Sequence, residues 1–305
     1  MEGTTNASEE IKPVEGSVFL KKHFPLLAKL PYPGKYDDLG STGKEILSDD
    51  SFEGFRTELT CNHSEKYNSS HIFHLFTPRG ENTSPHYLYN IFYNSDNTFC
   101  FARIDNERKL FCKFGHSLFN KKLNLHFVAH MPKDLTANAS IEADYKLPFA
   151  SLGFKADKTF TRSFSVLTSL PKNFSFGYEY TIVPEQQFEV QHFALRYQKN
   201  ALSYLATINT SQQLNLSCTY KKNNLEAVSD FMVGPVQVGV LGTQFGAGFK
   251  YFFKNNILRL KGDSTGHIVG TYEEGITNFM KISYSASINY LTSEYKFGIG
   301  LSAVK

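Results

Sequence analysis

The chain has 305 residues, with 32 Lys and Arg against 29 Asp and Glu and a net charge of +3. This length allows one large or two ordinary domains with a real core. The balanced charge excludes a nucleic-acid binder whose affinity rests on neutralising phosphates, and we expect no nucleic-acid partner. The mean hydropathy of −0.31 is that of a soluble protein. However, a membrane β-barrel alternates apolar and polar residues and also averages to near-neutral hydropathy.

Residues 1–50 differ in pattern from the rest. The first ten residues carry three glutamates, with neither the basic and apolar regions of a secretory signal nor the arginines of a cleavable presequence, so any organelle address is expected to be internal. A short segment, Ser17–Leu30, is interrupted by Pro25 and followed by turn residues. The next stretch, Asp37–Leu47, is expected to be a helix, with Asp37 and Asp38 in its first turn. We therefore divide the chain into an N-terminal extension with a pore-lining helix, residues 1–50, and a second domain, residues 51–305.

From about Gly54 onward the apolar residues recur with a period of two, which is typical of β-strands. In Ala137–Leu147, for example, apolar residues occupy every second position and Asn, Ser, Glu, Asp and Lys the positions between them. The same sorting recurs in other stretches: Lys122–Val128, Asn173–Thr181, Gln213–Tyr220, Gln244–Phe253 and Met280–Tyr290. Each of these stretches is expected to be a strand with one apolar and one polar face.

About 19 or 20 such runs follow Gly54, and Val236–Leu241 is either a strand or a connector. The spacing is roughly 13 residues per strand and turn, close to the roughly 9–11 residues that a tilted strand needs to cross a bilayer. Soluble strands are shorter, and a soluble barrel of so many strands would enclose a lumen too wide to pack. The pattern thus favours an all-β transmembrane antiparallel barrel, with its apolar face toward lipid and its polar face toward a wet interior. A soluble β-rich binding protein remains an alternative.

Motifs for catalysis, nucleotides and metals are weak. Gly298–Ala303 matches a dinucleotide fingerprint but is followed by no helix, and the glycines around Gly242 lack the ending of a P-loop. The histidine pairs His71/His74 and His126/His130 have unsuitable strand spacing for a metal. The four scattered cysteines indicate reduced thiols rather than a disulfide framework. We expect no catalytic, cofactor-binding or metal site and therefore no enzyme.

Two segments resemble a known family. The first has Pro-Gly, an aromatic residue, an acidic pair and Leu, then an aromatic residue, Glu and Gly: Pro33, Gly34, Tyr36, Asp37, Asp38, Leu39, Phe52, Glu53 and Gly54. It is similar to the entry of the channel-forming subunit of the mitochondrial outer-membrane protein translocase, the TOM complex, in the mitochondrial porin superfamily. The second is similar to the mitochondrial β-signal for membrane assembly: Lys296, Gly298, Leu301 and Ala303. Ala303 is a weak final hydrophobic residue, and Gly266 stands where many relatives have Trp.

The resemblance implies a 19-stranded barrel whose first and last strands are parallel, with the N-terminal helix inside the lumen. It implies a protein-conducting channel in the mitochondrial outer membrane that passes unfolded precursors from cytosol to intermembrane space. The implied partners are presequence-bearing precursors, receptor and small helical subunits, the sorting and assembly machinery and membrane lipid, in an oligomeric complex. A voltage-dependent anion channel, the alternative metabolite pore, has its helix close to its N-terminus, whereas about 30 residues precede Pro31 here.

The lumen is the expected path for basic presequences. By strand parity, four carboxylates point inward and are the candidates to attract them: Glu58, Glu142, Asp144 and Glu179. The same faces also carry basic residues: Arg56, Lys146, Lys281 and Lys296. The sequence therefore predicts a lumen of mixed sign, and a merely solvated polar wall remains the alternative for each of these residues.

Overall fold

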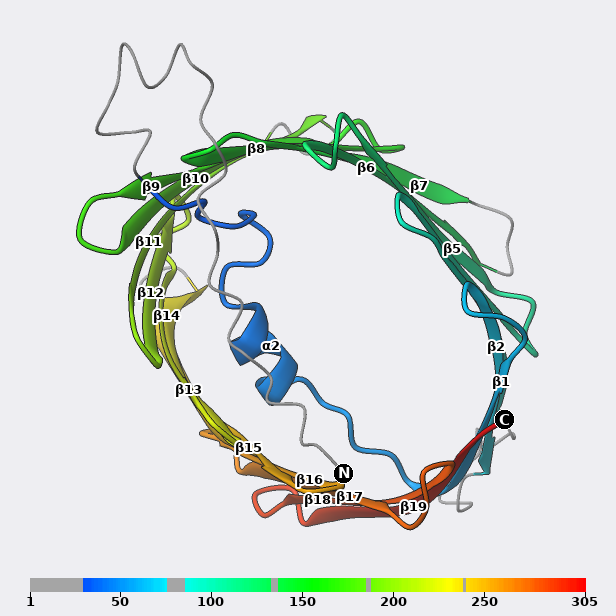
Figure 1. The fold of residues 1–305 in the computed structure, drawn as a ribbon. Coiled ribbons are helices and arrows are strands. Elements are labelled where there is room, and N and C mark those ends of the chain that lie inside the picture. The colour runs from blue at the N-terminus through cyan, green and yellow to red at the C-terminus, as the bar shows by residue number, and fades with distance from the viewer. Residues whose placement is uncertain (1–29, 76–85, 133–136, 185–187, 238–239) are drawn as a thin grey trace.

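A computed structural model describes residues 30–75, 86–132, 137–184, 188–237 and 240–305. Within them, nineteen strands form one closed ring around a lumen that contains a short helix, as the view along the barrel in Figure 1 shows. In the described residues, no helix has both the length and the apolar character needed to span a membrane. The predicted 19-stranded barrel with a helix inside it is thus confirmed.

The helix is α2, Ser41–Leu47, and nineteen strands follow it in chain order. The strands are β1 Gly54–Asn62, β2 Tyr67–Leu75, β3 His86–Asn94, β4 Thr98–Asp105, β5 Leu110–Leu118, β6 Leu123–Met131, β7 Asn138–Lys146, β8 Ala150–Asp157, β9 Arg162–Leu170, β10 Phe174–Val183, β11 Phe188–Lys199, β12 Leu202–Asn209, β13 Leu214–Lys222, β14 Leu225–Gln237, β15 Val240–Phe253, β16 Asn256–Asp263, β17 His267–Gly275, β18 Met280–Asn289 and β19 Glu294–Val304.

Each strand pairs in antiparallel fashion with the strands before and after it, except where the ring closes. There β1 pairs in parallel with β19, from Gly54 opposite Gly298 to Thr60 opposite Val304. An odd number of strands in an up-and-down order makes the first and last run in the same direction, so closure requires a parallel pair. Closure also gives every strand of the described ring a partner on both sides. The rim that holds Lys305 and the turn after β1 is called the C-terminal rim below.

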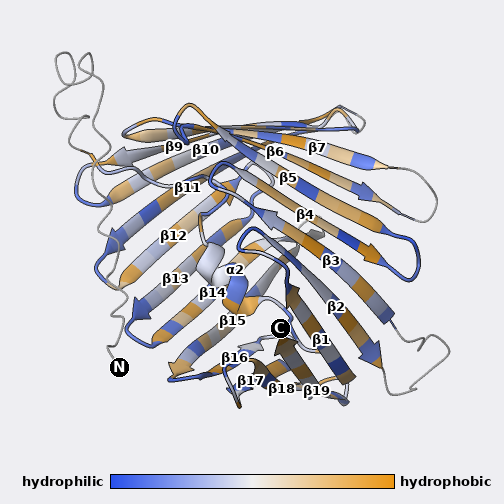
Figure 2. Ribbon diagram, turned by 45° about the vertical axis from the view of Figure 1, so that its right-hand side comes forward, coloured by the Kyte–Doolittle hydropathy of each residue, from blue (hydrophilic) through white to orange (hydrophobic). Residues whose placement is uncertain are grey.

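The two faces of the wall sort as the period of two predicts. In β1 the side chains of Phe55 and Leu59 point outward and are 44% and 43% exposed, whereas Arg56 and Glu58 point inward and bond to each other at 3.3 Å. Figure 2 shows this alternation of hydrophobic and hydrophilic residues along most strands. The outer face carries most of the exposed Phe, Leu, Ile and Tyr side chains. Such an outer face is stable only against lipid, because water around it would cost about 25 cal/mol per Å² of apolar surface.

Two sequence predictions need correction or sharpening. The helix begins at Ser41 and not at Asp37, because Gly40 adopts a left-handed φ of 71° that interrupts helical geometry, and Asp37 and Asp38 form a turn before it. The doubtful stretch Val236–Leu241 contains the end of β14 and the start of β15, with a register shift between Pro235 and Gln237. The predicted segment Ser17–Leu30 lies outside the described residues, apart from Leu30.

Candidate functional site in the barrel lumen

Residues 30–53, called the inner segment below, run along the inner wall of the barrel before the chain enters β1 (Figure 1). Its helix α2 contacts β13, β14, β15 and β16. The part of the segment before α2 lies against β7–β12. The segment therefore lies along one side of the lumen wall, and Figure 1 shows β2 and β5 on the other side, away from its ribbon.

A small apolar cluster fixes the middle of the inner segment. Leu39 is 6% exposed and packs with Leu167 of β9 and Ala194 of β11, beside the ring of Tyr36. The ring of Tyr36 lies over Gly177, where a Cβ atom would come within 2.8 Å of it. Burial and the nearby Glu179 carboxylate raise the pKa of Tyr36 above its ordinary value. This cluster is a buried core of the barrel, and it lies on the inside of the wall.

Side chains of the wall also bind the backbone of the inner segment. The Ser169 hydroxyl donates to the carbonyl of Pro31 at 2.6 Å, and the Arg196 guanidinium donates to the carbonyl of Pro33. Prolines have no amide hydrogen to donate, so their carbonyls are the groups that the wall can bind. Burial raises the pKa of Tyr32 to about 12, so its phenol is neutral at physiological pH. These contacts hold the Pro-Gly turn against β9 and β11.

Ion pairs join the same region to the carboxylates that the sequence singled out. Lys35 donates to Asp144 at 2.7 Å, and both side chains are less than a quarter exposed. Lys155 pairs with Asp37 at 2.5 Å and lies opposite Glu142 in the β7–β8 register. The negative charge of the predicted carboxylates at this position is therefore partly neutralised by Lys35, a residue whose place in the lumen no strand pattern could reveal.

The C-terminal end of α2 meets a basic strip on β15 and β16. Lys250 donates to Glu45 at 2.8 Å, Arg259 pairs with Asp50 at 2.7 Å, and Lys261 donates to the Leu47 carbonyl at 3.0 Å. Cations are favourable here because the last carbonyls of a helix are unpaired and carry partial negative charge. The hydrogen bond and charge of Lys250 hold the pKa of Glu45 below its ordinary range. The strip thus fixes the orientation of a helix of only seven residues.

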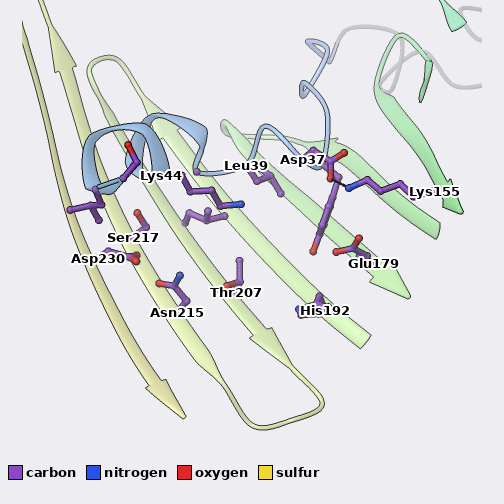
Figure 3. Close-up of a pocket in the computed structure, with 16 residues that line it drawn as sticks. Asp37, Leu39, Lys44, Lys155, Glu179, His192, Thr207, Asn215, Ser217 and Asp230 are labelled. Carbon is purple, nitrogen blue, oxygen red and sulfur yellow. Dashed lines mark hydrogen bonds and ion pairs between the residues drawn. The ribbon is translucent and has the colours of Figure 1, made fainter. Parts of the chain in front are cut away.

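A cavity of about 570 Å³ lies between α2 and the wall, and Figure 3 shows the residues that line it. Polar side chains of the wall line it, together with leucines of α2, of the preceding turn and of β12; the polar ones are Glu179, His192, Asn215, Ser217 and Asp230. No group of three or more His, Cys, Asp or Glu in the described residues is arranged to hold a metal ion. The cavity is a part of the lumen beside α2.

All four predicted carboxylates point into the lumen, as strand parity requires. Glu142 and Asp144 of β7 and Glu179 of β10 lie on one region of the wall, near Lys155, which lies between them. Glu58 is separate, on β1 beside Arg56. Their role in attracting presequences stays a proposal.

An inward aromatic group was missed by the sequence reasoning, although strand parity could have found it. The rings of Phe92, Phe101 and Phe111 lie on the inner face of β3, β4 and β5, with centroids 4.7 Å and 5.8 Å apart. The guanidinium of Arg103 lies 5.4 Å from the centroid of the Phe101 ring. These rings lie on β3–β5, whereas α2 of the inner segment contacts β13–β16.

The residues of the predicted β-signal lie on β19, at the seam with β1. Lys296 and Gly298 face inward, and Leu301 and Ala303 face outward. A Cβ atom at Gly298 would come within 2.3 Å of the Phe52 carbonyl oxygen and 2.6 Å of its ring. The amide of Phe52 also donates to the hydroxyl of Ser285 on β18 at 3.1 Å. The two segments that carry the family resemblance, more than 240 residues apart, therefore meet in space.

Comparisons with known proteins identify chains that are similar to this one. A family model described as eukaryotic porin matches residues 32–298. The Arabidopsis thaliana protein named "Probable mitochondrial import receptor subunit TOM40-2" is 20% identical over 290 residues, which cover 90% of this chain and 92% of that protein. A solved structure described as "Asymmetric conductivity of engineered proteins" aligns with a TM-score of 0.49 and 9% identity, over 77% of this chain and 96% of that one.

Proposed function

The chain belongs to the eukaryotic porin family, and we propose that within it the chain is the protein-conducting channel of the mitochondrial outer membrane. It passes unfolded precursor proteins, with or without presequences, from the cytosol to the intermembrane space. The relative named for a mitochondrial import receptor subunit supports this assignment along nearly the whole length. The function is transport and needs no catalytic group or cofactor.

One structural observation carries the proposal. The residues that resemble the translocase are those that anchor the inner segment and close the ring: Tyr36 and Leu39 in the buried cluster, and Phe52 against Gly298 at the seam. Placed this way, the segment lies on the wall and does not cross the axis of the barrel (Figure 1). A ring of 19 strands leaves an aqueous path.

The proposal includes the partners that the resemblance implies. They are presequence-bearing precursors, receptor and small helical subunits of the translocase, and the sorting and assembly machinery that inserts the barrel. We further propose that Glu142, Asp144 and Glu179, with Glu58 on the opposite side, attract basic presequences, and that Lys296, Gly298, Leu301 and Ala303 form the assembly signal. The division into residues 1–50 and 51–305 is likewise retained as a proposal.

The test begins with import into mitochondria of a precursor in which a presequence is fused to a domain that a bound ligand keeps folded, so that the precursor is arrested. The full chain is then purified from these mitochondria in a mild detergent. The chain is expected to migrate in a large complex with small helical subunits and to retain the arrested precursor. A metabolite pore is the alternative function. Migration as a barrel without such subunits and without the precursor would favour it and contradict the proposal.

A further inference from the structure

The outer face of the barrel carries a groove that the transport function does not use. It has a volume of about 420 Å³ and lies across β11–β14. Its sides are large apolar residues, with Leu195, Tyr204, Leu216 and Phe231 between 38% and 47% exposed. Its floor is formed by small outward residues on three adjacent strands: Ala206, Cys218 and Ser229.

The groove is short along the strands. The register places its side chains in two neighbouring rows, one with Tyr204, Cys218 and Ser229 and one with Ala206, Leu216 and Phe231. Two rows on one face are about 7 Å apart, whereas a helix that spans the bilayer covers about 30 Å. The groove therefore matches part of a lipid acyl chain better than a transmembrane helix of a partner.

Two lysines lie at the end of the groove nearest the C-terminal rim. Lys199 ends β11 and Lys222 ends β13, and both share the outward parity of the groove residues. Both are exposed, and neither bonds to any group in the described residues. By contrast, the neighbouring Lys221 points inward and pairs with Glu226 at 2.6 Å. Two strand spacings and a stagger of two residues separate the lysines, roughly 12 Å, so their flexible side chains can converge on one phosphate between them.

From the rim toward the middle of the strands, the outward side chains change from cationic to hydroxyl-bearing to apolar. A phospholipid presents its phosphate, its ester groups and its acyl chains in the same order. The lysine ammonium groups lie at the rim, the phenols of Tyr197 and Tyr204 and the Ser229 hydroxyl lie next, and the apolar row lies deepest. The Ser229 hydroxyl has no hydrogen-bond partner in the described residues, so it is available to an ester carbonyl. We infer that this face binds one anionic phospholipid, with its phosphate on Lys199 and Lys222 and an acyl chain in the groove. This site goes beyond the proposed transport function.

The absence of tryptophan from the chain allows a direct test. The variant Tyr204→Trp places a single indole fluorophore in the groove, and Tyr284→Trp is the matched control. The Tyr284 side chain also points outward and is 43% exposed, but the nearby outward charge is Glu274 of the adjacent strand and not a lysine. Each full-length variant is refolded in phosphatidylcholine vesicles that contain brominated phosphatidylglycerol or brominated phosphatidylcholine. Quenching at position 204 is expected to be several-fold stronger with the anionic lipid, and equal for both lipids at position 284.

The lysines are tested in the Tyr204→Trp background. Lys199→Gln with Lys222→Gln is expected to abolish the preference for anionic lipid, and Lys199→Arg with Lys222→Arg to retain it, which separates charge from a folding defect. Equal quenching of the fluorophore at position 204 by both lipids, or a preference that survives the glutamine changes, would overturn the inference. Protection of this fluorophore from both lipids in the native complex would also overturn it and assign the groove to a partner protein.

Discussion

Gly298 is a position at which the closure of the barrel leaves no room for a side chain. The Phe52 backbone and ring occupy the space that its side chain would need, and Phe52 is held there by Ser285. Interior strand glycines are usually unfavourable, so a glycine at this contact indicates close approach of the chain. The β-signal thus has a packing role in the finished barrel in addition to its proposed role in assembly.

Replacement of this glycine by alanine tests the packing role. Gly298→Ala is expected to destabilise the refolded barrel by about 1–3 kcal/mol, the usual cost of an inserted methyl group in a packed site. Gly270→Ala on β17 is the control, since its Cβ would meet its nearest neighbour at an ordinary 3.5 Å. The free energy of unfolding is measured in guanidinium chloride. Equal stability of the two variants would show that Phe52 moves aside freely.

The proposed assembly role of the same strand is tested separately in mitochondria. A Gly298→Glu, Leu301→Glu double variant is expected to remain unassembled, because it changes one inward and one outward position of the proposed signal. Assembly is followed on native gels after import. Normal insertion of the double variant would refute the role of Gly298 and Leu301 as a signal.

The position of α2 depends on contacts with the wall and not on helix propensity. A helix of seven residues is too short to be stable alone. Lys250 and Lys261 bind the C-terminal end of the helix, Arg259 pairs with Asp50 just after it, and Ile46 supplies a buried apolar contact. The helix is therefore expected to leave the wall when these charges are removed, without unfolding of the barrel.

Acid should loosen α2 through Glu45. Because its pKa is lowered in the docked state, Glu45 stabilises docking above the ordinary carboxyl range, and this contribution is lost as the pH falls through the lowered pKa. Open-channel current noise in planar bilayers is expected to rise between neutral pH and about pH 3. Lys250→Gln should show raised noise already at neutral pH and a smaller rise in acid. Identical pH profiles for the two proteins would contradict this role of the pair.

The strands and the inner segment differ in how far the sequence predicts them. A strand such as β18, Met280–Asn289, shows its two faces in its own residues, so its period of two predicts both its existence and its orientation. The inner segment has no such pattern, because its place is set by contacts such as Lys35 with Asp144, which are 109 positions apart. The helix start at Ser41 was missed since Gly40 takes a left-handed conformation that the acidic pair before it does not reveal.

For the whole molecule, the lumen is a surface of mixed sign whose carboxylates differ in availability. Asp144 is already paired with Lys35, whereas Glu142 and Glu179 line the same region without a direct ion pair to the described part of the inner segment. The path for basic presequences should therefore depend on Glu142 and Glu179 more than on Asp144. The effect should weaken as ionic strength rises.

Charge reversal tests this path. Glu142→Lys with Glu179→Lys is expected to reduce import of presequence proteins into isolated mitochondria several-fold more than import of carrier-type precursors. The control is Glu189→Lys with Glu274→Lys, which changes two carboxylates that face outward near the ends of β11 and β17. Equal import of both precursor classes by the Glu142→Lys, Glu179→Lys variant would contradict the proposed role of these carboxylates. It would not contradict the channel function.

If precursor proteins travel inside this barrel, two neighbouring residues on opposite faces of one strand should differ in their access to the precursor. A photoreactive side chain is placed at Phe101, which faces the lumen, or at Ala102, which faces outward. With a presequence precursor arrested during import, cross-links to the precursor are expected from position 101 and none from position 102. Cross-links from neither position, in a chain that is assembled in the membrane, would show that the precursor does not pass through the lumen.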